Sequence, residues 1–262
     1  MKYEMIDFHT HPYVDTANSI CYYKDRCKMP SAQVKEYLTG LGITKICGSV
    51  LDNSVKAPKW SDIARMNDEA IAAKAFYGEF YELGFHVHAG FVDESLKEIE
   101  RMEKLGAKLV GELIPYSHGW DYGAAGFEEI LKALDEKDMV VSFHSTYGAP
   151  NCAGDIDRMV ERHPKITFVA AHPGEKDSYM RHLERMKRFE NYYLDLSGTG
   201  LFRFGMLAYG VSEMGSERFL FGSDFSVCDP SMYIASIATD PFLSEEEKRN
   251  IFSGNAKRIL KL

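Results

Sequence analysis

The feature that most constrains the fold of this chain is a regular alternation of short apolar runs with longer segments of helical periodicity. Parallel strands need long crossover connections, so repeated strand–helix alternation implies a parallel sheet and an α/β fold. Eight runs have the length and composition of strands: Met5–His9, Thr44–Val50, His86–Val92, Lys108–Ile114, Met139–His144, Ile166–His172, Tyr192–Ser197 and Phe219–Asp224.

The segments between these runs carry the apolar stripes of helices that pack on a sheet. One stripe consists of Phe127, Ile130, Leu131 and Leu134, and another of Leu96, Ile99, Met102 and Leu105. Pro30-Ser31 is typical of a helix start, and Gly84 and Gly106 are typical of the residues that end helices.

Chain length favours a closed barrel. Eight strand–helix units in 262 residues match the usual size of a single (β/α)8 TIM barrel. No linker or low-complexity tract divides the chain, so we expect residues 1–262 to form one domain. A doubly wound open sheet is the alternative, because the order of strands along the chain does not fix their order in space.

Composition limits the classes of partner that this chain is expected to bind. The formal net charge of −8 argues against nucleic acid and anionic membranes, which both require clustered Lys and Arg. The N-terminus has no apolar signal core, and no run approaches the ~20 apolar residues of a membrane helix. We therefore expect a cytoplasmic protein with a small-molecule substrate, and a homo-oligomer is left open. The five cysteines are expected to be free thiols: Cys21, Cys27, Cys47, Cys152 and Cys228.

The first strand ends in a histidine pair, His9 and His11. Residues two apart in a strand point to the same side, so the two imidazoles should project together and form half of a metal site. A pair of ordinary polar histidines is the alternative, since His-x-His alone is a weak motif.

Two further strands end in histidine, at His144 and at His172. A single histidine at such a position is usually a hydrogen-bonded core residue. Two of them at equivalent strand ends, together with the first pair, favour a common site, because a barrel brings the carboxyl ends of its strands into one ring.

Two carboxylates complete the set. Asp224 ends the last apolar strand, where it is either a helix cap or a metal ligand and proton acceptor. Glu112 lies inside an apolar strand and needs a cationic partner there, which would be either two bridged metals or a neighbouring His or Lys.

Other polar groups near strand ends are candidates for substrate contacts. Tyr116 and His118 follow the fourth strand, and Arg203 follows the seventh, where a guanidinium suits a substrate carboxylate or phosphate. His86 and His88 are expected to be structural, and His163 and His182 are expected at the surface of helices.

These residues in this order resemble the amidohydrolase superfamily, and more closely its branch related to aminocarboxymuconate-semialdehyde decarboxylase. The likeness rests on His9-Thr10-His11-Pro12, His144, His172-Pro173-Gly174, Gly222-Ser223-Asp224 and the C-terminal segment Phe252–Leu260. It runs over the whole chain and implies a metal site formed by His9, His11, His144, His172 and Asp224.

The resemblance also implies a mechanism. Members of the superfamily activate water on Zn²⁺ or a similar divalent ion, with the residue at the position of Asp224 as general base. In members with one metal, the histidine at the position of His172 orients the water. Many members hold two metals through a carboxylated Lys or a Glu on the fourth strand, and Glu112 favours that arrangement. We therefore expect a divalent metal cofactor, Zn²⁺ first, as one or two ions.

The resulting prediction is a metal-dependent hydrolase that attacks an ester, lactone, amide or phosphoester of a small molecule. The alternative is a metal-dependent lyase, a decarboxylase or hydratase of a small unsaturated or aromatic carboxylic acid. Two metals and no arginine clamp favour hydrolysis, whereas one metal and an arginine-lined aromatic pocket favour the lyase. A barrel that only binds a ligand is a third possibility, which the complete ligand set disfavours.

Overall fold

A computed structural model describes residues 2–27, 29–145, 152–201 and 203–262. In this part of the chain eight parallel strands follow one another in sequence order. They are β1 (Met5–Asp7), β2 (Ile43–Gly48), β3 (Tyr81–Phe85), β4 (Leu109–Leu113), β5 (Val140–His144), β6 (Thr167–Ala171), β7 (Tyr192–Asp195) and β8 (Phe219–Leu220).

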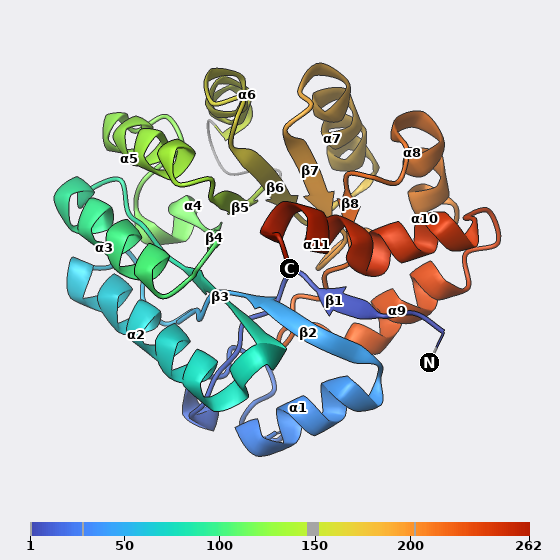
Figure 1. Cartoon of the computed structure of the whole chain (residues 1–262), viewed down its shortest axis with the longest axis horizontal. Coiled ribbons are helices and arrows are strands. Elements are labelled where there is room, and N and C mark those ends of the chain that lie inside the picture. Colours follow the sequence, from blue (N-terminus) through green and yellow to red (C-terminus); the bar gives the residue numbers. More distant parts are fainter. Residues whose placement is uncertain (1, 28, 146–151, 202) are drawn as a thin grey trace.

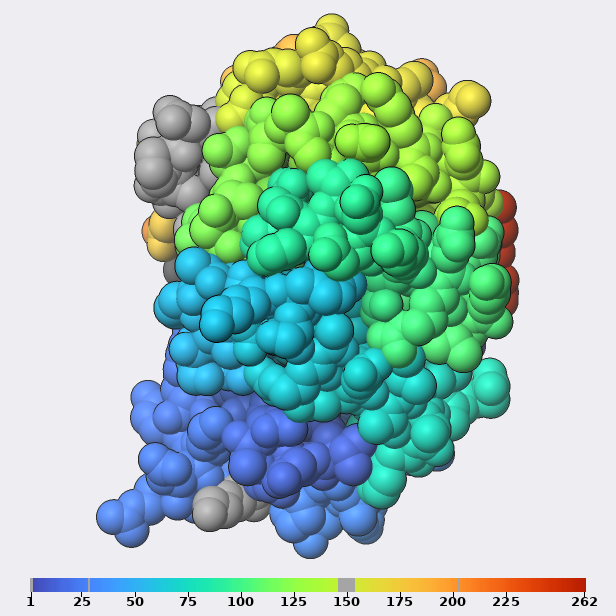
Figure 2. All heavy atoms as spheres, turned by 90° about the vertical axis from the view of Figure 1, so that its left-hand side faces the viewer, coloured from blue at the N-terminus to red at the C-terminus, as the bar shows by residue number. Residues whose placement is uncertain are grey.

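Helices surround the strands as an outer ring (Figure 1). The longer ones between strands are α1 (Ser31–Gly40), α2 (Trp60–Tyr77), α3 (Val92–Lys104), α5 (Ala125–Glu136), α6 (Cys152–Arg162), α7 (Lys176–Arg188) and α8 (Met206–Met214). Short elements are η1 (Thr16–Asn18), η2 (Gly78–Phe80) and α4 (Pro115–His118), and the chain ends with α9 (Pro230–Ala238), α10 (Glu245–Arg249), the π-helical η3 (Asn250–Gly254) and α11 (Asn255–Leu260). Figure 2 shows one side of the molecule, where α2, α3 and α5 form a continuous wall.

The first and last strands close the sheet into a barrel. The amide of Phe8 donates to the carbonyl of Phe221 over 2.9 Å, and the amide of Asp224 donates to the carbonyl of His9 over 2.8 Å. A parallel bridge between Thr10 and Phe225 continues the contact. The predicted (β/α)8 barrel is therefore confirmed, and the open-sheet alternative is excluded because the two edges meet.

One apolar cluster packs the inside of the barrel. Residues that point into it, such as Ile6, Leu109 and Val169, pack together with Ala256 and Leu260 of α11. Helix α11 thereby covers the end of the barrel where the strands begin, which faces the viewer in Figure 1. The opposite end, where the strands finish, carries the polar residues.

Most of the predicted helical features are confirmed. The stripe on α5 is fully buried: Phe127, Ile130, Leu131 and Leu134. Helix α1 starts at Ser31 as predicted, and Gly106, with φ +82°, follows the end of α3. Leu105 does not belong to the α3 stripe, because the helix ends at Lys104 and the leucine side chain is 54% exposed.

The predicted third strand, residues 86–92, is wrong. The strand is β3 (Tyr81–Phe85), and Val92 is already the first residue of α3. Gly84 lies inside this strand and does not end a helix. A Cβ at Gly84 would meet the backbone oxygens of Gly48 at 2.6 Å and Gly111 at 2.9 Å, so the close approach of the neighbouring strands requires glycine there.

His163 and His182 are also placed differently from the prediction, because both are buried. His182 Nδ1 lies 2.8 Å from the hydroxyl of Tyr192, and His163 Nε2 lies 3.3 Å from a carboxylate oxygen of Glu128. His182 lies in α7 and His163 directly follows α6, and each is buried beside a polar partner. In the described part of the chain no helix is both long enough and apolar enough to cross a bilayer.

Three buried histidines predict sensitivity to acid. Burial lowers the pKa of His86 to about 4, and of His118 and His182 to about 3, from the ordinary value of 6.5. The unfolded chain therefore binds their protons first, and stability present above pH 6.5 is lost as the pH falls. We expect the free energy of unfolding to drop by about 1.4 kcal/mol per pH unit for each histidine.

Urea titrations of chelator-treated protein at pH 7.0, 6.0 and 5.0 measure this loss. The metal-free condition removes any contribution from bound ions. His182→Gln should flatten the pH dependence by about one proton, since it removes one titrating group. A free energy of unfolding that is constant between pH 7 and 5 would contradict the prediction.

Candidate metal centre

The predicted site residues converge at the carboxyl ends of the strands. His9 and His11 follow β1, Glu112 lies in β4, and His144 is the last residue of β5. His172 and Asp224 follow β6 and β8 at positions where the backbone is left-handed, with φ +69° and +63°. Such conformations are costly for residues other than glycine and cluster at functional sites.

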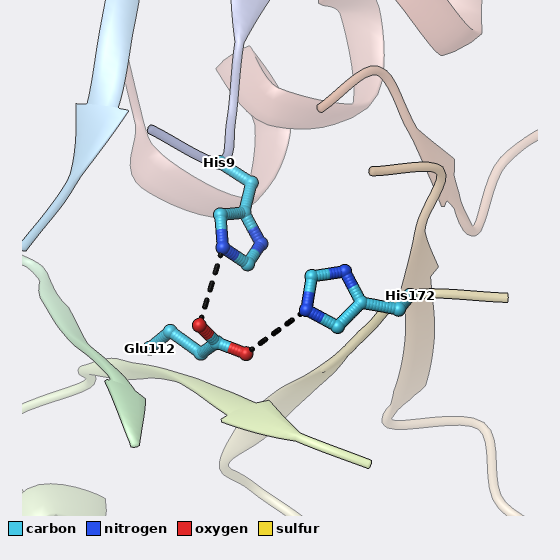
Figure 3. Close-up of side chains that lie close together, drawn as sticks. All are labelled: His9, Glu112 and His172. Atoms are coloured by element: carbon cyan, nitrogen blue, oxygen red, sulfur yellow. Dashed lines mark ion pairs between the residues drawn. The ribbon is translucent and has the colours of Figure 1, made fainter. Parts of the chain in front are cut away.

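Glu112 occupies the middle of this cluster and is only 5% exposed. Its Oε1 lies 2.6 Å from His144 Nδ1 and 3.3 Å from His172 Nε2. Its Oε2 lies 3.4 Å from His9 Nε2 and 3.6 Å from His11 Nε2. Figure 3 shows Glu112 between the rings of His9 and His172. Each carboxylate oxygen therefore faces a different pair of imidazoles.

Asp224 lies on the side of His11. Its Oδ1 is 3.3 Å from His11 Nε2 and 3.8 Å from His9 Nε2. Two sets of three donor atoms each lie within 4.8 Å of one another: His9, Glu112 and His172, and His9, His11 and Asp224.

Hydrogen bonds on the far sides of the rings orient the histidines as a cation site requires. His11 Nδ1 lies 3.0 Å from the carbonyl of Ser49, and His9 Nδ1 lies 2.9 Å from Oδ2 of Asp195. Both acceptors require N–H donors, so the Nε2 atoms, 3.2 Å apart, point their lone pairs at each other and at the carboxylates. Only a proton or a metal ion between them makes that arrangement favourable.

The pKa shifts of the buried groups also favour a cation in this cluster. Burial lowers the pKa of His11, but hydrogen bonds to Asp224 and Glu112 outweigh it and raise the pKa to about 9. For Glu112, burial raises the pKa, whereas the charges of His144 and His9 hold it well below its usual range. The donor set of imidazole nitrogens and carboxylate oxygens therefore fits a divalent cation.

Two functional candidates escaped the sequence analysis. Asp195, the last residue of β7, is fully buried beside His9, and the hydroxyl of Ser197 lies 3.0 Å from His172 Nδ1. A carboxylate that ends an apolar strand is the same signal that identified Asp224, and it applies equally to Asp195.

A pocket of about 510 Å³ opens beside the cluster. It is lined by Tyr22, His144, Ser145, His172, Gly174, Glu175, Ser178, Gly198, Thr199, Asp224, Val227 and Cys228. Three of the predicted site residues thus line the pocket, whereas His9, His11 and Glu112 are buried and are not among its lining residues.

The three predicted substrate contacts are not among these lining residues. Tyr116 is 55% exposed, and its ring centroid lies 5.0 Å from that of His144. His118 is buried, and its carbonyl lies 2.9 Å from His88 Nε2. Arg203 pairs with Glu175 at the pocket edge and lines a separate pocket of about 220 Å³.

The cysteines agree with the prediction of free thiols as far as the structure describes them. Cys21, Cys27, Cys47 and Cys228 form no disulfide, and Cys228 lines the pocket. The side chain of Cys152 lies outside the described residues.

A closed parallel barrel with histidines and carboxylates at its strand ends defines a class of metal-dependent enzymes. The family model described as "Amidohydrolase" matches residues 6–262, and the chain belongs to this family. Family and donor set together support a divalent metal. No curated protein matches the sequence.

Solved structures share the fold at low sequence identity. The 2,6-dihydroxybenzoate decarboxylase from Rhizobium has a TM-score of 0.78 and 16% identity, with 99% of each chain covered. The 5-carboxyvanillate decarboxylase from Sphingomonas paucimobilis has a TM-score of 0.74 and 16% identity, also with 99% of each chain covered. A dihydroxybenzoic acid decarboxylase from Polaromonas sp. JS666, with bound manganese, has a TM-score of 0.74 and 18% identity over 99% of this chain and 97% of that chain.

The raised pKa of His11 predicts that metal binding releases protons. With a pKa of about 9, this imidazole is protonated at pH 7.5 in the metal-free protein, and the proton must leave before Nε2 can bind a metal. Affinity should therefore fall as the pH drops below 9. Calorimetry in two buffers of different ionisation enthalpy should show at least one proton released per ion bound, and release of none would contradict the prediction.

Proposed function

We propose that this protein is a metal-dependent decarboxylase of a small aromatic carboxylic acid. The observation that carries the proposal is the pocket of about 510 Å³ with His144, His172 and Asp224 in its wall. Decarboxylases of aromatic acids that share the fold over nearly the whole chain support it, and they favour the lyase over the predicted hydrolase.

The residues that would hold the metal are His9, His11, Glu112, His144, His172 and Asp224. When bound, the cation would supply positive charge that attracts and orients the substrate carboxylate. The sequence analysis predicts Zn²⁺. Manganese is bound in a similar structure, and nitrogen and oxygen donors of this kind accept either ion.

Decarboxylation exchanges carbon dioxide for a proton at one ring carbon. The bond from the ring to the carboxylate breaks, carbon dioxide leaves, and a C–H bond forms at the same carbon. Asp224 is placed to hold the proton that is needed, because its carboxylate lies both in the cluster and in the pocket wall. His172, in the same wall, would help to orient the substrate.

The remaining lining residues suit a hydroxylated ring. Ser145, Ser178 and Thr199 contribute hydroxyl groups, which match phenolic substituents. Arg203 would influence the substrate only through Glu175, because its guanidinium pairs with this carboxylate, which lines the pocket.

Hydrolysis is the second candidate, and two observations favour it. The oxygens of Glu112 face two different pairs of imidazoles, as a carboxylate that bridges two metals would. Among the described residues that line the pocket, none is Lys or Arg. In this reaction Asp224 would accept a proton from water as general base.

A substrate panel decides between the two reactions. Protein loaded with Mn²⁺ or Zn²⁺ is incubated with hydroxybenzoates in one arm, and with esters, lactones and phosphoesters in the other. We expect a hydroxybenzoate to lose carbon dioxide, and NMR of the product arene measures this reaction. Chelator should abolish this activity, and a divalent ion should restore it. Turnover of the second panel alone would establish hydrolysis instead.

Asp224→Asn tests the proposed proton carrier. The amide keeps the shape and one oxygen but cannot hold a transferable proton, so kcat should fall at least about a hundredfold. Circular dichroism and metal content should remain near those of the wild type, which separates catalysis from folding. A variant that retains metal and near wild-type kcat would move the assignment to His172 or Glu112.

A further inference from the structure

We propose that Asp195 is a positioning residue that, directly and through Ser197, holds the imidazoles of His9 and His172 with their Nε2 atoms toward the metal. The inference rests on the metal centre and not on which reaction it performs. Strand β7 supplies none of the proposed metal ligands, yet it ends in this buried carboxylate.

The direct arm joins Asp195 to His9. Oδ2 of Asp195 lies 2.9 Å from His9 Nδ1, and both side chains are almost completely buried. The other oxygen of Asp195, Oδ1, accepts from the amide and the hydroxyl of Ser197, so the carboxyl group acts as an acceptor on both sides. His9 Nδ1 is therefore the donor, which leaves Nε2 for the metal.

The indirect arm runs through Ser197. Its hydroxyl donates to Oδ1 of Asp195, and its amide donates to the same oxygen over 2.9 Å. Because the serine hydrogen is used in this way, its oxygen is left to accept. His172 Nδ1 lies 3.0 Å from that oxygen and is the donor. His172 Nε2 then faces Glu112 at 3.3 Å, as Figure 3 shows.

The backbone after Asp195 fixes the His172 ring as well. Gly198 has φ +61°, and a Cβ on it would lie 2.3 Å from His172 Nδ1. The end of β7 is therefore shaped to the ring edge that carries this hydrogen. Asp195 does not line the pocket, so its effect on the site must pass through the two imidazoles.

The two arms differ in what they hold. Loss of the Asp195 charge releases His9 directly and His172 through Ser197. Loss of the Ser197 hydroxyl releases His172 and removes a 3.1 Å contact to His9 Nδ1, while His9 keeps its carboxylate. Residues that orient metal-bound histidines typically contribute about 10- to 100-fold to metal affinity.

Asp7 offers a matched control. It is also a fully buried carboxylate at a strand end and accepts from a serine hydroxyl, that of Ser223. It contacts His9 only through the backbone amide, at 3.3 Å, and touches no imidazole nitrogen. Asp7→Asn therefore reports the general effect of replacing a buried carboxyl group close to the site.

The experiment measures the Mn²⁺ dissociation constant of the full chain by calorimetry, without substrate. We expect Asp195→Asn to weaken binding by about 10- to 100-fold, Ser197→Ala by less than Asp195→Asn, and Asp7→Asn by less than about threefold. The double variant should bind no more weakly than Asp195→Asn, because Ser197 acts through that carboxylate. Unchanged affinity in Asp195→Asn, or an equal loss in Asp7→Asn, overturns the proposal.

A second measurement uses the wild type and does not depend on the variants folding. Long-range ¹H–¹⁵N NMR spectra of Zn²⁺-loaded protein report which ring nitrogen carries hydrogen. We expect hydrogen on Nδ1 of both His9 and His172, and hydrogen on Nε2 of either ring overturns the proposal. A wild-type protein that binds neither ion overturns it together with the metal centre, whereas metal binding without decarboxylation leaves it standing and rejects only the proposed reaction.

Discussion

The candidate site depends on one interaction, the contact between the buried carboxylate of Glu112 and the imidazoles around it. A carboxylate that is 5% exposed pays heavily for lost hydration unless positive charge compensates it. His9, His11, His144 and His172 can supply that charge only when they carry protons or share a cation. Because those histidines come from three different strands, the requirement of one carboxylate specifies where the ends of β1, β5 and β6 must meet.

In the barrel, the residues that form the polar site and the residues that stabilise the fold lie at opposite ends. Apolar side chains and α11 fill the end where the strands begin, and that packing needs no polar partner. At the other end, backbone geometry serves the site, as the left-handed conformations of His172 and Asp224 show. The well-packed end can offset the strain of the polar end, which is the usual division in proteins of this architecture.

The sequence was sufficient to predict those elements, and that convergence of site residues, which follow from a simple rule. Parallel strands finish at one end of a barrel, so His9, His144 and Asp224 could be brought together without coordinates. The third strand was misplaced because His86 and His88 alternate in the sequence as strand residues do, although both follow the end of β3. The hydrogen bonds of Asp195 were equally out of reach, since they depend on which ring nitrogens face each other across separate strands.

Barrel closure between β1 and the end of β8 has a consequence for how the protein is made. His9 leaves the ribosome early in synthesis, whereas Asp224 emerges only after most of the chain, and α11 follows it. During that interval Glu112 and the imidazoles of the first six strands have been made, but the edge that completes the ring has not. A nascent chain therefore lacks the full set of donors until its last strand docks on its first. Only a chain in which the end of β8 has docked on β1 therefore presents Asp224 together with the other donors.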